Sequence, residues 1–459
     1  MDLHSAIAVT GTVTAVIAVL SLVRFLVYWF AVSDAFWQDK PLEPGDVSRF
    51  TWHFFIPCRD EETVVATSVA RLRDTFPGCH VWAIDDASED RTRAIIEERA
   101  AHDPHVHLVA RRRPDARLGK GAALNAAYRQ LSDWLPADAD RSEVVVCVVD
   151  ADGQLAANAL EQASAAFEDP QLGGAQIGVR MRNAGDPLPR PDAGRLANAH
   201  ARWLARMQDV EFSVNNAGMQ ILRRRTNSVG LGGNGQFVRL TALDSIADDA
   251  TAAAWPDDAL LEDYESGLLM LLDGWRISHL EGTYVSQEGL VSARRFMTQR
   301  TRWAQGNLQC LRYLPRILRS KNYTFWGKWE TAYTLMQGPL HILMTITTLL
   351  FMGLCFVDFT RGPTAFLDSA FAHLLLPSVF FLIAAGPLAM WGTRYRATRL
   401  PESRWFAGLM WGLGLWVYTY HLFVVTNRGL ARIVLGRNGW AKTRRNAEAL
   451  GIGPVAKEA

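Results

Sequence analysis

The sequence predicts an α/β domain with a mainly parallel, doubly wound sheet, joined to an α-helical membrane region by interfacial helices. Over residues 42–290, short apolar runs that end in polar residues alternate with segments of helical periodicity, an order typical of parallel sheets. Residues 331–436 are mostly apolar and contain stretches of about 20 residues, the length that crosses a bilayer. The chain therefore divides into a water-soluble part and a membrane part.

Four apolar stretches are long enough to span a membrane, at about 6–32, 331–357, 366–391 and 405–425. The first has no basic amino-terminal region and no small-x-small cleavage site, which favours a retained anchor over a cleaved signal peptide. Arg24 and Lys40 lie towards its far end, so the amino terminus should be outside and the α/β domain cytoplasmic. The basic residues 428–446 also favour the inside, so 404–436 makes two short passes, forms a re-entrant turn or does not cross.

The predicted organisation has five parts: an anchor (1–41), the α/β domain (42–290), amphipathic interface helices (291–330), carboxyl-terminal membrane helices (331–436) and a basic cytoplasmic tail (437–459). Residues 289–321 carry eight basic side chains and no acidic one, which suits helices that lie under anionic lipid headgroups. The formal net charge of +1 lacks the basic excess of a nucleic-acid-binding protein. The five cysteines are scattered and form neither a disulfide nor a metal framework. These features indicate a multi-pass protein of the plasma membrane.

Acidic residues follow three predicted strands, in TWHFFIPCRDEE (51–62), HVWAIDDASED (80–90) and EVVVCVVDADG (143–153). Ligands of doubly wound sheets bind outside the carboxyl ends of the strands. Aspartate is also a common helix cap and turn residue, but three successive acidic strand ends favour a shared ligand site. Asp150 and Asp152 are two residues apart, so they point to one side of an extended chain. Together they suit Mg²⁺ or Mn²⁺, which prefer oxygen ligands.

Two glycine-rich segments are candidates for close contact with a ligand. RLGKGAALN (117–125) does not fit the phosphate-loop spacing of ATPases. A helix that begins near Ala122 would still place Lys120 at an anion-binding end, although an ordinary glycine turn is equally compatible. GLGGNGQFVRL (230–240) lets the backbone approach a ligand, or forms a plain hairpin, since Asn-Gly is a strong turn signal.

Two predicted helices carry the remaining candidates. WPDDALLEDYESGLLMLLDGW (255–275) has an apolar face, with Glu262 and Asp263 in its first turn. There they either suit the helix dipole, or Asp263 faces a cleft as a general base. In MTQRTRWAQGNLQ (297–309), Gln299, Arg302 and Trp303 share one helical face. A membrane-binding surface accounts for the charge of that segment but not for glutamine and tryptophan on the arginine's face.

In this order, the motifs IPCRDEE, IDDAS, GKGAALN, DAD, GGNGQF, LLEDYE and QRTRW, followed by membrane helices, resemble the membrane-bound family 2 glycosyltransferases. That family includes cellulose, chitin, hyaluronan and poly-N-acetylglucosamine synthases. The resemblance covers about residues 50–330 motif by motif and the membrane region in outline. It implies a Rossmann-like GT-A fold, a UDP-sugar donor, Mg²⁺ or Mn²⁺ as cofactor, and a glycan or lipid acceptor.

The resemblance also implies a role for each motif. Asp86 would bind the uridine part of the donor, with Pro57, Arg59 and Glu61 beside it and Lys120 near the nucleotide. Asp150 and Asp152 would hold the metal on the diphosphate, and Asp263, next to Glu262, would deprotonate the acceptor hydroxyl. Gln299, Arg302 and Trp303 would cover the diphosphate and shape the acceptor site, to which Gly233, Asn234 and Gln236 would add a loop.

The predicted function is an inverting, metal-dependent glycosyltransferase that extends a β-linked polysaccharide from UDP-glucose or UDP-N-acetylglucosamine and exports it. One base and direct attack invert the anomeric configuration. The alternative is transfer of one sugar to a lipid. A transporter fits less well, because the spans hold little charge beyond Arg24, His341 and His421. Expected partners are the donor, the acceptor, membrane lipids and accessory export or modifying subunits, but not nucleic acid.

Overall fold

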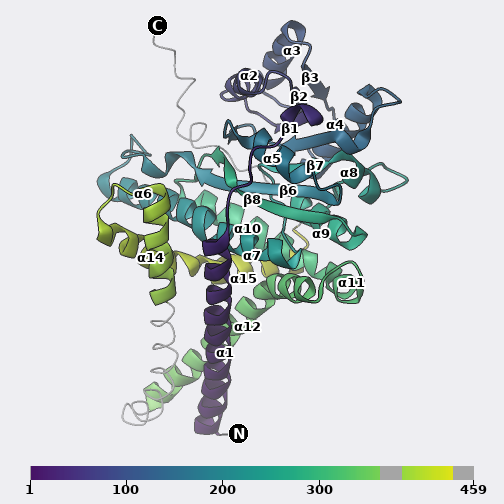
Figure 1. Ribbon diagram of the computed structural model, residues 1–459. Coiled ribbons are helices and arrows are strands. Elements are labelled where there is room, and N and C mark those ends of the chain that lie inside the picture. The colour runs from purple at the N-terminus through teal and green to yellow at the C-terminus, as the bar shows by residue number, and fades with distance from the viewer. Residues whose placement is uncertain (1, 362–384, 438–459) are drawn as a thin grey trace.

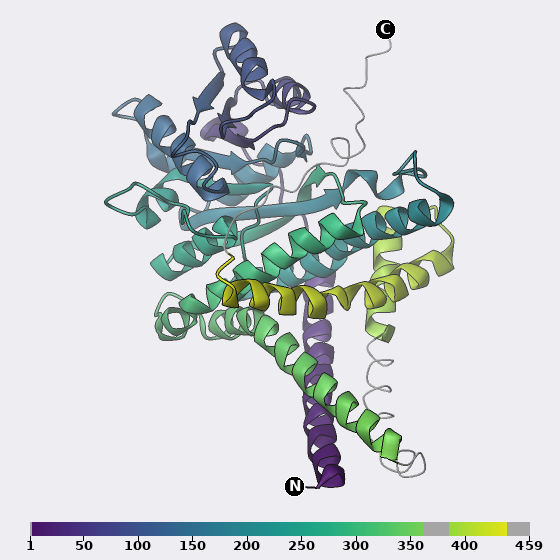
Figure 2. The same cartoon turned by 180° about the vertical axis from the view of Figure 1, so that it is seen from behind.

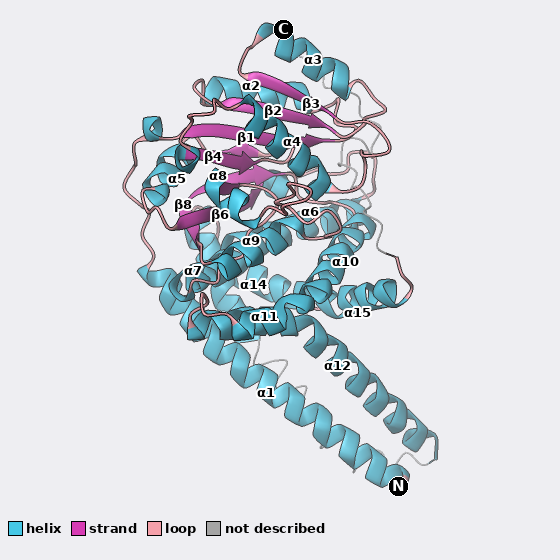
Figure 3. Ribbon diagram, turned by 90° about the vertical axis from the view of Figure 1, so that its right-hand side faces the viewer, coloured by secondary structure: helices cyan, strands magenta, loops and turns pink. Residues whose placement is uncertain are grey.

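The computed structural model describes residues 2–361 and 385–437. A sheet-containing domain lies at one end of two long helices, α1 (Leu3–Gln38) and α12 (Phe325–Arg361), which run side by side away from it (Figure 1). The amino terminus lies at the far end of α1 from the sheet (Figure 3). This arrangement confirms an α/β domain joined to long apolar helices.

The first half of the sheet is parallel, as predicted. Its strands are β1 (Thr51–Cys58), β2 (His80–Asp85), β3 (Val106–Ala110) and β4 (Val144–Val148). Strand β1 pairs in parallel with both β2 and β4, and β2 pairs with β3. The connecting helices are α2 (Val65–Thr75), α3 (Thr92–His102) and α4 (Lys120–Trp134). The β4 residues are buried on both faces of the sheet, which accounts for the unbroken apolar run before Asp150.

The second half of the sheet is mixed. Its strands are β5 (Gln154–Leu155), β6 (Leu172–Met181), β7 (Gln236–Arg239) and β8 (Arg276–Gln287). Strand β7 runs antiparallel to β4 and β6, whereas β8 is parallel to β6. The order across the eight described strands is β3-β2-β1-β4-β7-β6-β8-β5. The antiparallel β7 brings the 227–235 loop back to the carboxyl ends of the first four strands.

Helix α5 (Ala159–Phe167) packs with α2 and α3 on one face of the sheet, and α8 (Leu240–Ile246) packs with α4 on the other. The layer between the sheet and the long spans consists of α6 (Arg195–Val210), α7 (Ala217–Thr226), α9 (Glu262–Asp273), α10 (Ala293–Gln309) and α11 (Leu314–Arg319). A π-helical turn, Glu211–Asn216, joins α6 to α7. Helices α9 and α10 confirm the two amphipathic helices predicted at 255–275 and 297–309. Helix α10 lies between the sheet and the membrane helices (Figure 3).

Buried polar contacts fasten this layer to the long helices. Glu330 of α12 accepts hydrogen bonds from the Tyr28 hydroxyl of α1 (2.8 Å) and from Arg223 Nε of α7 (3.1 Å). Arg223 also donates to Thr334 Oγ1 on α12 (2.9 Å). Three helices that are distant in the sequence therefore meet at one ion pair at the base of the domain.

The segment 404–436 lies across the direction of the spans. Three described helical segments are long and apolar enough to cross a membrane: Leu3–Gln38, Phe325–Thr360 and Trp405–Val434. The third consists of α14 (Trp405–Thr419) and α15 (His421–Val434), which run beneath the domain and across α1 rather than alongside it (Figure 2). The number of membrane crossings in 404–436 stays a prediction. Most of the span predicted at 366–391 lies outside the described residues. The residues that follow, 385–399, form a continuous helix.

Helix α14 packs on residues 385–399 at backbone distance. A Cβ atom at Gly412 would lie 2.3 Å from the Cα of Ala389, and one at Gly408 would lie 2.8 Å from the Cα of Thr393. Such short distances leave no room for a side chain, so glycine is required where the two helices cross.

We expect Gly412→Val to push α14 away from residues 385–399 and to lower stability by about 1–3 kcal/mol or more, as overpacking does. Thermal unfolding of the purified protein in detergent would measure the loss. Gly353→Val on α12 is the matched control, because a Cβ at Gly353 meets nothing within 4 Å. Equal midpoints for the two variants would contradict the described packing.

Candidate active site

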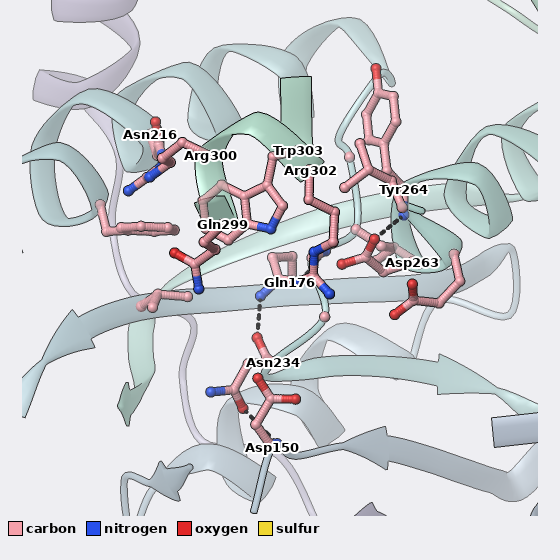
Figure 4. A pocket seen from close by; sticks show the side chains of 18 of the residues that line it. Asp150, Gln176, Asn216, Asn234, Asp263, Tyr264, Gln299, Arg300, Arg302 and Trp303 are labelled. Carbon is pink, nitrogen blue, oxygen red and sulfur yellow. Dashed lines mark hydrogen bonds between the residues drawn. The ribbon is translucent and has the colours of Figure 1, made fainter. Parts of the chain in front are cut away.

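One continuous cavity of about 640 Å³ extends from the carboxyl ends of the parallel strands to α12 and α15. At one end it is lined by residues that follow β1, β2 and β4, and at the other by residues of α12 and α15. Of the residues that the sequence predicted for the site, the cavity is lined by Pro57, Arg59, Glu61, Asp86, Lys120, Asp150, Asp152, Gly233, Asn234, Glu262, Asp263, Gln299, Arg302 and Trp303. Figure 4 shows several of these side chains around one space. The predicted motifs therefore come together in three dimensions.

Lys120 links the DAD motif to the glycine-rich loop. Its Nζ donates to Asp150 Oδ1 (2.6 Å) and to the carbonyl of Gly233 (2.5 Å). Asn234 Oδ1 accepts a hydrogen bond from the backbone N–H of Asp150 (3.2 Å). Asp152 Oδ2 accepts one from the backbone N–H of Glu288 (3.0 Å). Both carboxylates are thus oriented at the cavity wall by partners from other parts of the chain.

The glycine loop approaches the acidic cluster closely. A Cβ atom at Gly233 would lie 2.9 Å from Asp263 Oδ2 and 3.0 Å from Lys120 Nζ. Only glycine fits at this distance without displacing one of the two charged groups. Gly233 therefore allows the backbone of this segment to pack directly against Asp263 and Lys120. The segment is more than the plain hairpin that the sequence also allowed.

Glu262 and Asp263 begin α9 and face the cavity. Burial, followed by repulsion from Asp263, raises the pKa of Glu262. Burial also raises the pKa of Asp263, although the charge of Lys120 opposes that shift. Asp263 Oδ1 accepts a hydrogen bond from the backbone N–H of Tyr264 (2.8 Å), which orients its carboxylate. A carboxylate whose pKa is raised accepts a proton more readily than an exposed one.

Arg302 extends from α10 towards these acids (Figure 4). Burial lowers the pKa of its guanidinium, and the charges of Glu262, Asp263 and Asp150 act in the opposite direction. Because an arginine side chain stays protonated in proteins, Arg302 places a fixed positive charge in the cavity opposite the carboxylates.

Arg300 supports Trp303, and the sequence analysis did not single it out. Its guanidinium lies 4.4 Å from the centre of the Trp303 ring and donates to both carboxylate oxygens of Glu211 (2.9 and 2.6 Å). The Tyr418 hydroxyl of α14 donates to the same carboxylate (2.7 Å). The fork of two parallel hydrogen bonds fixes the guanidinium plane, so α14 and the π-helical turn both help to set the position of Trp303.

The prediction that Gln236 binds substrate is not supported. Its side chain is fully buried (0 % exposed) and is not among the residues that line the cavity. The cause is the register of β7, which pairs Gln236 with Val148 and Gln176 inside the sheet. Gln176 lines the cavity in its place: it accepts from the N–H of Gly232 (2.7 Å) and donates to the carbonyl of Asn234 (2.9 Å). A polar residue within the apolar LGGAQIGV run was the available signal.

Asp86 is engaged by two arginines. Its Oδ1 accepts from Arg111 Nη1 and, at 2.9 Å, from the backbone N–H of Arg117. Arg111 is 9 % exposed and Asp86 is 6 % exposed, so this ion pair is a buried one. These contacts hold the carboxylate of Asp86 at the cavity wall beside Pro57 and Glu61.

A comparison with protein families identifies the family to which this chain belongs. The model described as "Glycosyltransferase like family 2" matches residues 51–306, which is more than half of the chain and includes every predicted site residue. The chain belongs to the family 2 glycosyltransferases. It is therefore an enzyme that transfers a sugar.

The chain is also similar to individual proteins of known name. The chain is 27% identical over 426 residues to the beta-monoglucosyldiacylglycerol synthase of Synechocystis sp., a match that covers 89% of this chain and 78% of that protein. A synthase of the same name from Trichormus variabilis is 31% identical over 273 residues, 58% of this chain and 51% of its own length. A mannosyltransferase from Pyrobaculum calidifontis, solved with GDP-Man and Mn²⁺, has a TM-score of 0.60 at 14% identity and covers 95% of this chain and 100% of its own. That last likeness shows a shared fold.

We expect Glu211→Gln to destabilise the protein by about 3–5 kcal/mol, because it leaves the buried Arg300 without its carboxylate. The measurement is the unfolding midpoint in detergent. Combining Glu211→Gln with Arg300→Met should recover much of the loss, since the double change removes the uncompensated charge. Additive losses in the double variant would mean that the ion pair is not the source of the effect.

Proposed function

We propose that this enzyme transfers a single sugar from a nucleotide sugar to the hydroxyl of a membrane lipid, with inversion at the anomeric carbon. The observation that carries the proposal is the course of the cavity, which starts at the acidic strand ends and finishes between α12 and α15. A charged, water-soluble donor and an apolar acceptor can therefore reach Asp263 from opposite ends. The enzyme would work at the cytoplasmic face of the plasma membrane as a multi-pass protein.

The donor would occupy the strand ends. Asp86, Pro57, Arg59 and Glu61 line that end together and would bind the uridine part of UDP-glucose or UDP-N-acetylglucosamine. Lys120, which bridges Asp150 and the carbonyl of Gly233, would offer its ammonium to a donor phosphate. Glucose is favoured because the relatives from Synechocystis and Trichormus are named beta-monoglucosyldiacylglycerol synthases.

The residues present fit a divalent cation. Asp150 and Asp152 offer carboxylate oxygens from one strand end, and Mg²⁺ commonly binds one or two carboxylates together with substrate phosphates. No group of three or more metal-ligating side chains occurs among the described residues, so the donor's diphosphate would complete the coordination. When bound there, the cation would stabilise the negative charge that develops on the departing diphosphate.

The chain's own residues would carry out the remaining steps. Asp263 would take the proton from the acceptor hydroxyl as that oxygen attacks the anomeric carbon, while the bond to the diphosphate breaks on the opposite side. Arg302 would add a fixed positive charge for the leaving group. Trp303, held against Arg300, would cover the sugar and exclude water.

Two observations favour a lipid acceptor over the exported polysaccharide that the sequence favoured. The α12 residues that line the cavity end at His341, although the helix continues to Arg361. The cavity that the described residues line thus stops about halfway along α12. The relatives from Synechocystis and Trichormus are named as lipid glycosyltransferases. Accessory export subunits belong to the polysaccharide hypothesis and stay a prediction.

The proposal is tested by incubating the purified protein in detergent with a panel of labelled UDP- and GDP-sugars, Mn²⁺ and an extract of bacterial lipids. We expect label in the organic phase, in a product that carries one sugar. Label in a water-soluble polymer would instead support the polysaccharide hypothesis and contradict the proposal.

Asp263→Asn should lower the transfer rate by at least about 100-fold, the usual contribution of a general base, with little change in donor affinity. Initial rates together with donor binding by calorimetry would separate the two effects. Asp273→Asn, at the exposed far end of α9, is the matched control and should keep its activity. Full activity of Asp263→Asn would exclude Asp263 as the base.

Removal of divalent cations with EDTA should abolish transfer, and Mn²⁺ or Mg²⁺ should restore it. Asp152→Asn should raise the metal concentration needed for half-maximal rate by about tenfold or more, because one of two carboxylate ligands is lost. Asp138→Asn, an exposed aspartate outside the cavity, should need no additional metal. A rate that persists in EDTA would contradict the assignment of the two aspartates.

A further inference from the structure

We propose that the membrane end of the cavity binds an uncharged, hydroxyl-bearing lipid and discriminates against lipid phosphates. This inference rests on the proposed transfer to a lipid and names the chemical class of the acceptor. It follows from the side chains that line the end of the cavity near α12 and α15.

Uncharged polar groups and apolar groups alternate at this end. The α12 residues Thr334, Gln337, Gly338 and His341 follow one another at spacings of three, one and three, so they form one face of the helix. Leu422 and Val425 of α15 lie across from them. Amide, hydroxyl and imidazole groups can donate to and accept from a neutral hydroxyl, and the aliphatic side chains suit acyl chains.

The arginines that line the lower part of the cavity already have carboxylate partners. Arg300 is paired with Glu211, with side-chain exposures of 7 % and 13 %. Arg223 is paired with Glu330, each 10 % exposed. A lipid phosphate bound here would either be buried without a cation to pair with it, or would have to break one of these ion pairs. Burying an unpaired charge and breaking a buried ion pair both cost a large free energy.

The remaining Lys and Arg side chains in the cavity lining are Arg59, Lys120 and Arg302, and all three are assigned to the donor. Lys120 is held by Asp150, and Arg302 is surrounded by the charges of Glu262, Asp263 and Asp150. The donor brings its own diphosphate to these groups. A second phosphate placed near the attacking position would meet Glu262 and Asp263, which repel it. A neutral hydroxyl meets no such repulsion.

Arg24 of α1 is the competing candidate for a phosphate ligand. Its guanidinium lies 4.3 Å from the ring centre of Tyr333, one turn of α12 before Gln337, and its Nε and Nη1 atoms are buried without a hydrogen-bond partner in the described part of the chain. Arg24 is not among the residues that line the cavity. If the acceptor is uncharged, the charge of Arg24 should matter little to the reaction.

The test compares two acceptors in matched mixed micelles, 1,2-dioleoylglycerol and undecaprenyl phosphate, with labelled UDP-glucose, Mn²⁺ and the purified full-length protein. We expect the rate with dioleoylglycerol to exceed the rate with undecaprenyl phosphate by about tenfold or more. A preference for undecaprenyl phosphate would overturn the inference but leave lipid transfer intact. Transfer to neither lipid, with label in a water-soluble polymer, would contradict the proposed function as well.

Substitutions on α12 test where the acceptor binds. Gln337→Leu and His341→Leu should each raise the KM for dioleoylglycerol by about fivefold, the effect of losing one neutral hydrogen bond, without changing the KM for the donor. Thr347→Val, on α12 but outside the cavity, is the matched control. Arg24→Gln should leave both KM values unchanged. A tenfold loss of transfer in Arg24→Gln, or no effect of either cavity variant, would contradict the inference.

Discussion

The close packing of α10 between the start of α9 and α15 is the constraint on which the rest of the site depends. A Cβ atom at Gly306 of α10 would lie 2.6 Å from Leu261 Cγ, and one at Gly429 of α15 would lie 3.0 Å from the backbone nitrogen of Gln305. Neither contact leaves room for a larger residue. They set Arg302 opposite Glu262 and Asp263, so these two acids and α15 cannot shift independently.

The same cavity contains two chemical environments. Its lining includes seven carboxylates (Glu61, Asp86, Asp150, Asp152, Glu262, Asp263, Glu288) and five Lys or Arg side chains (Arg59, Lys120, Arg223, Arg300, Arg302). The carboxylates gather at the strand ends and beside α9, where the excess of negative charge attracts a cation. Near α12 and α15, amides, hydroxyls and aliphatic groups predominate. In the proposed reaction, this gradient would orient a charged donor and an amphiphilic acceptor.

Features encoded by neighbouring residues could be predicted from the sequence. The strands β1, β2 and β4, the pair Asp150 and Asp152, and the shared face of Gln299, Arg302 and Trp303 each follow from local spacing. Contacts between distant segments could not. Glu211 is 89 residues from Arg300 and 207 from Tyr418, and the burial of Gln236 depends on the register of β7. Hydropathy does not show how apolar helices are arranged relative to one another, so the course of α14 and α15 across α1 required the structure.

In the proposed reaction, donor and lipid meet at Asp263 from opposite ends of one cavity. A cryo-electron microscopy structure of the Asp263→Asn enzyme in lipid nanodiscs, with UDP-glucose, Mn²⁺ and dioleoylglycerol, tests it most directly. The account predicts the nucleotide at Asp86, Asp150 and Asp152, and one lipid between α12 and α15 whose hydroxyl points to residue 263. A glycan that continues past His341 along the membrane helices, or a nucleotide bound away from the three aspartates, would contradict it.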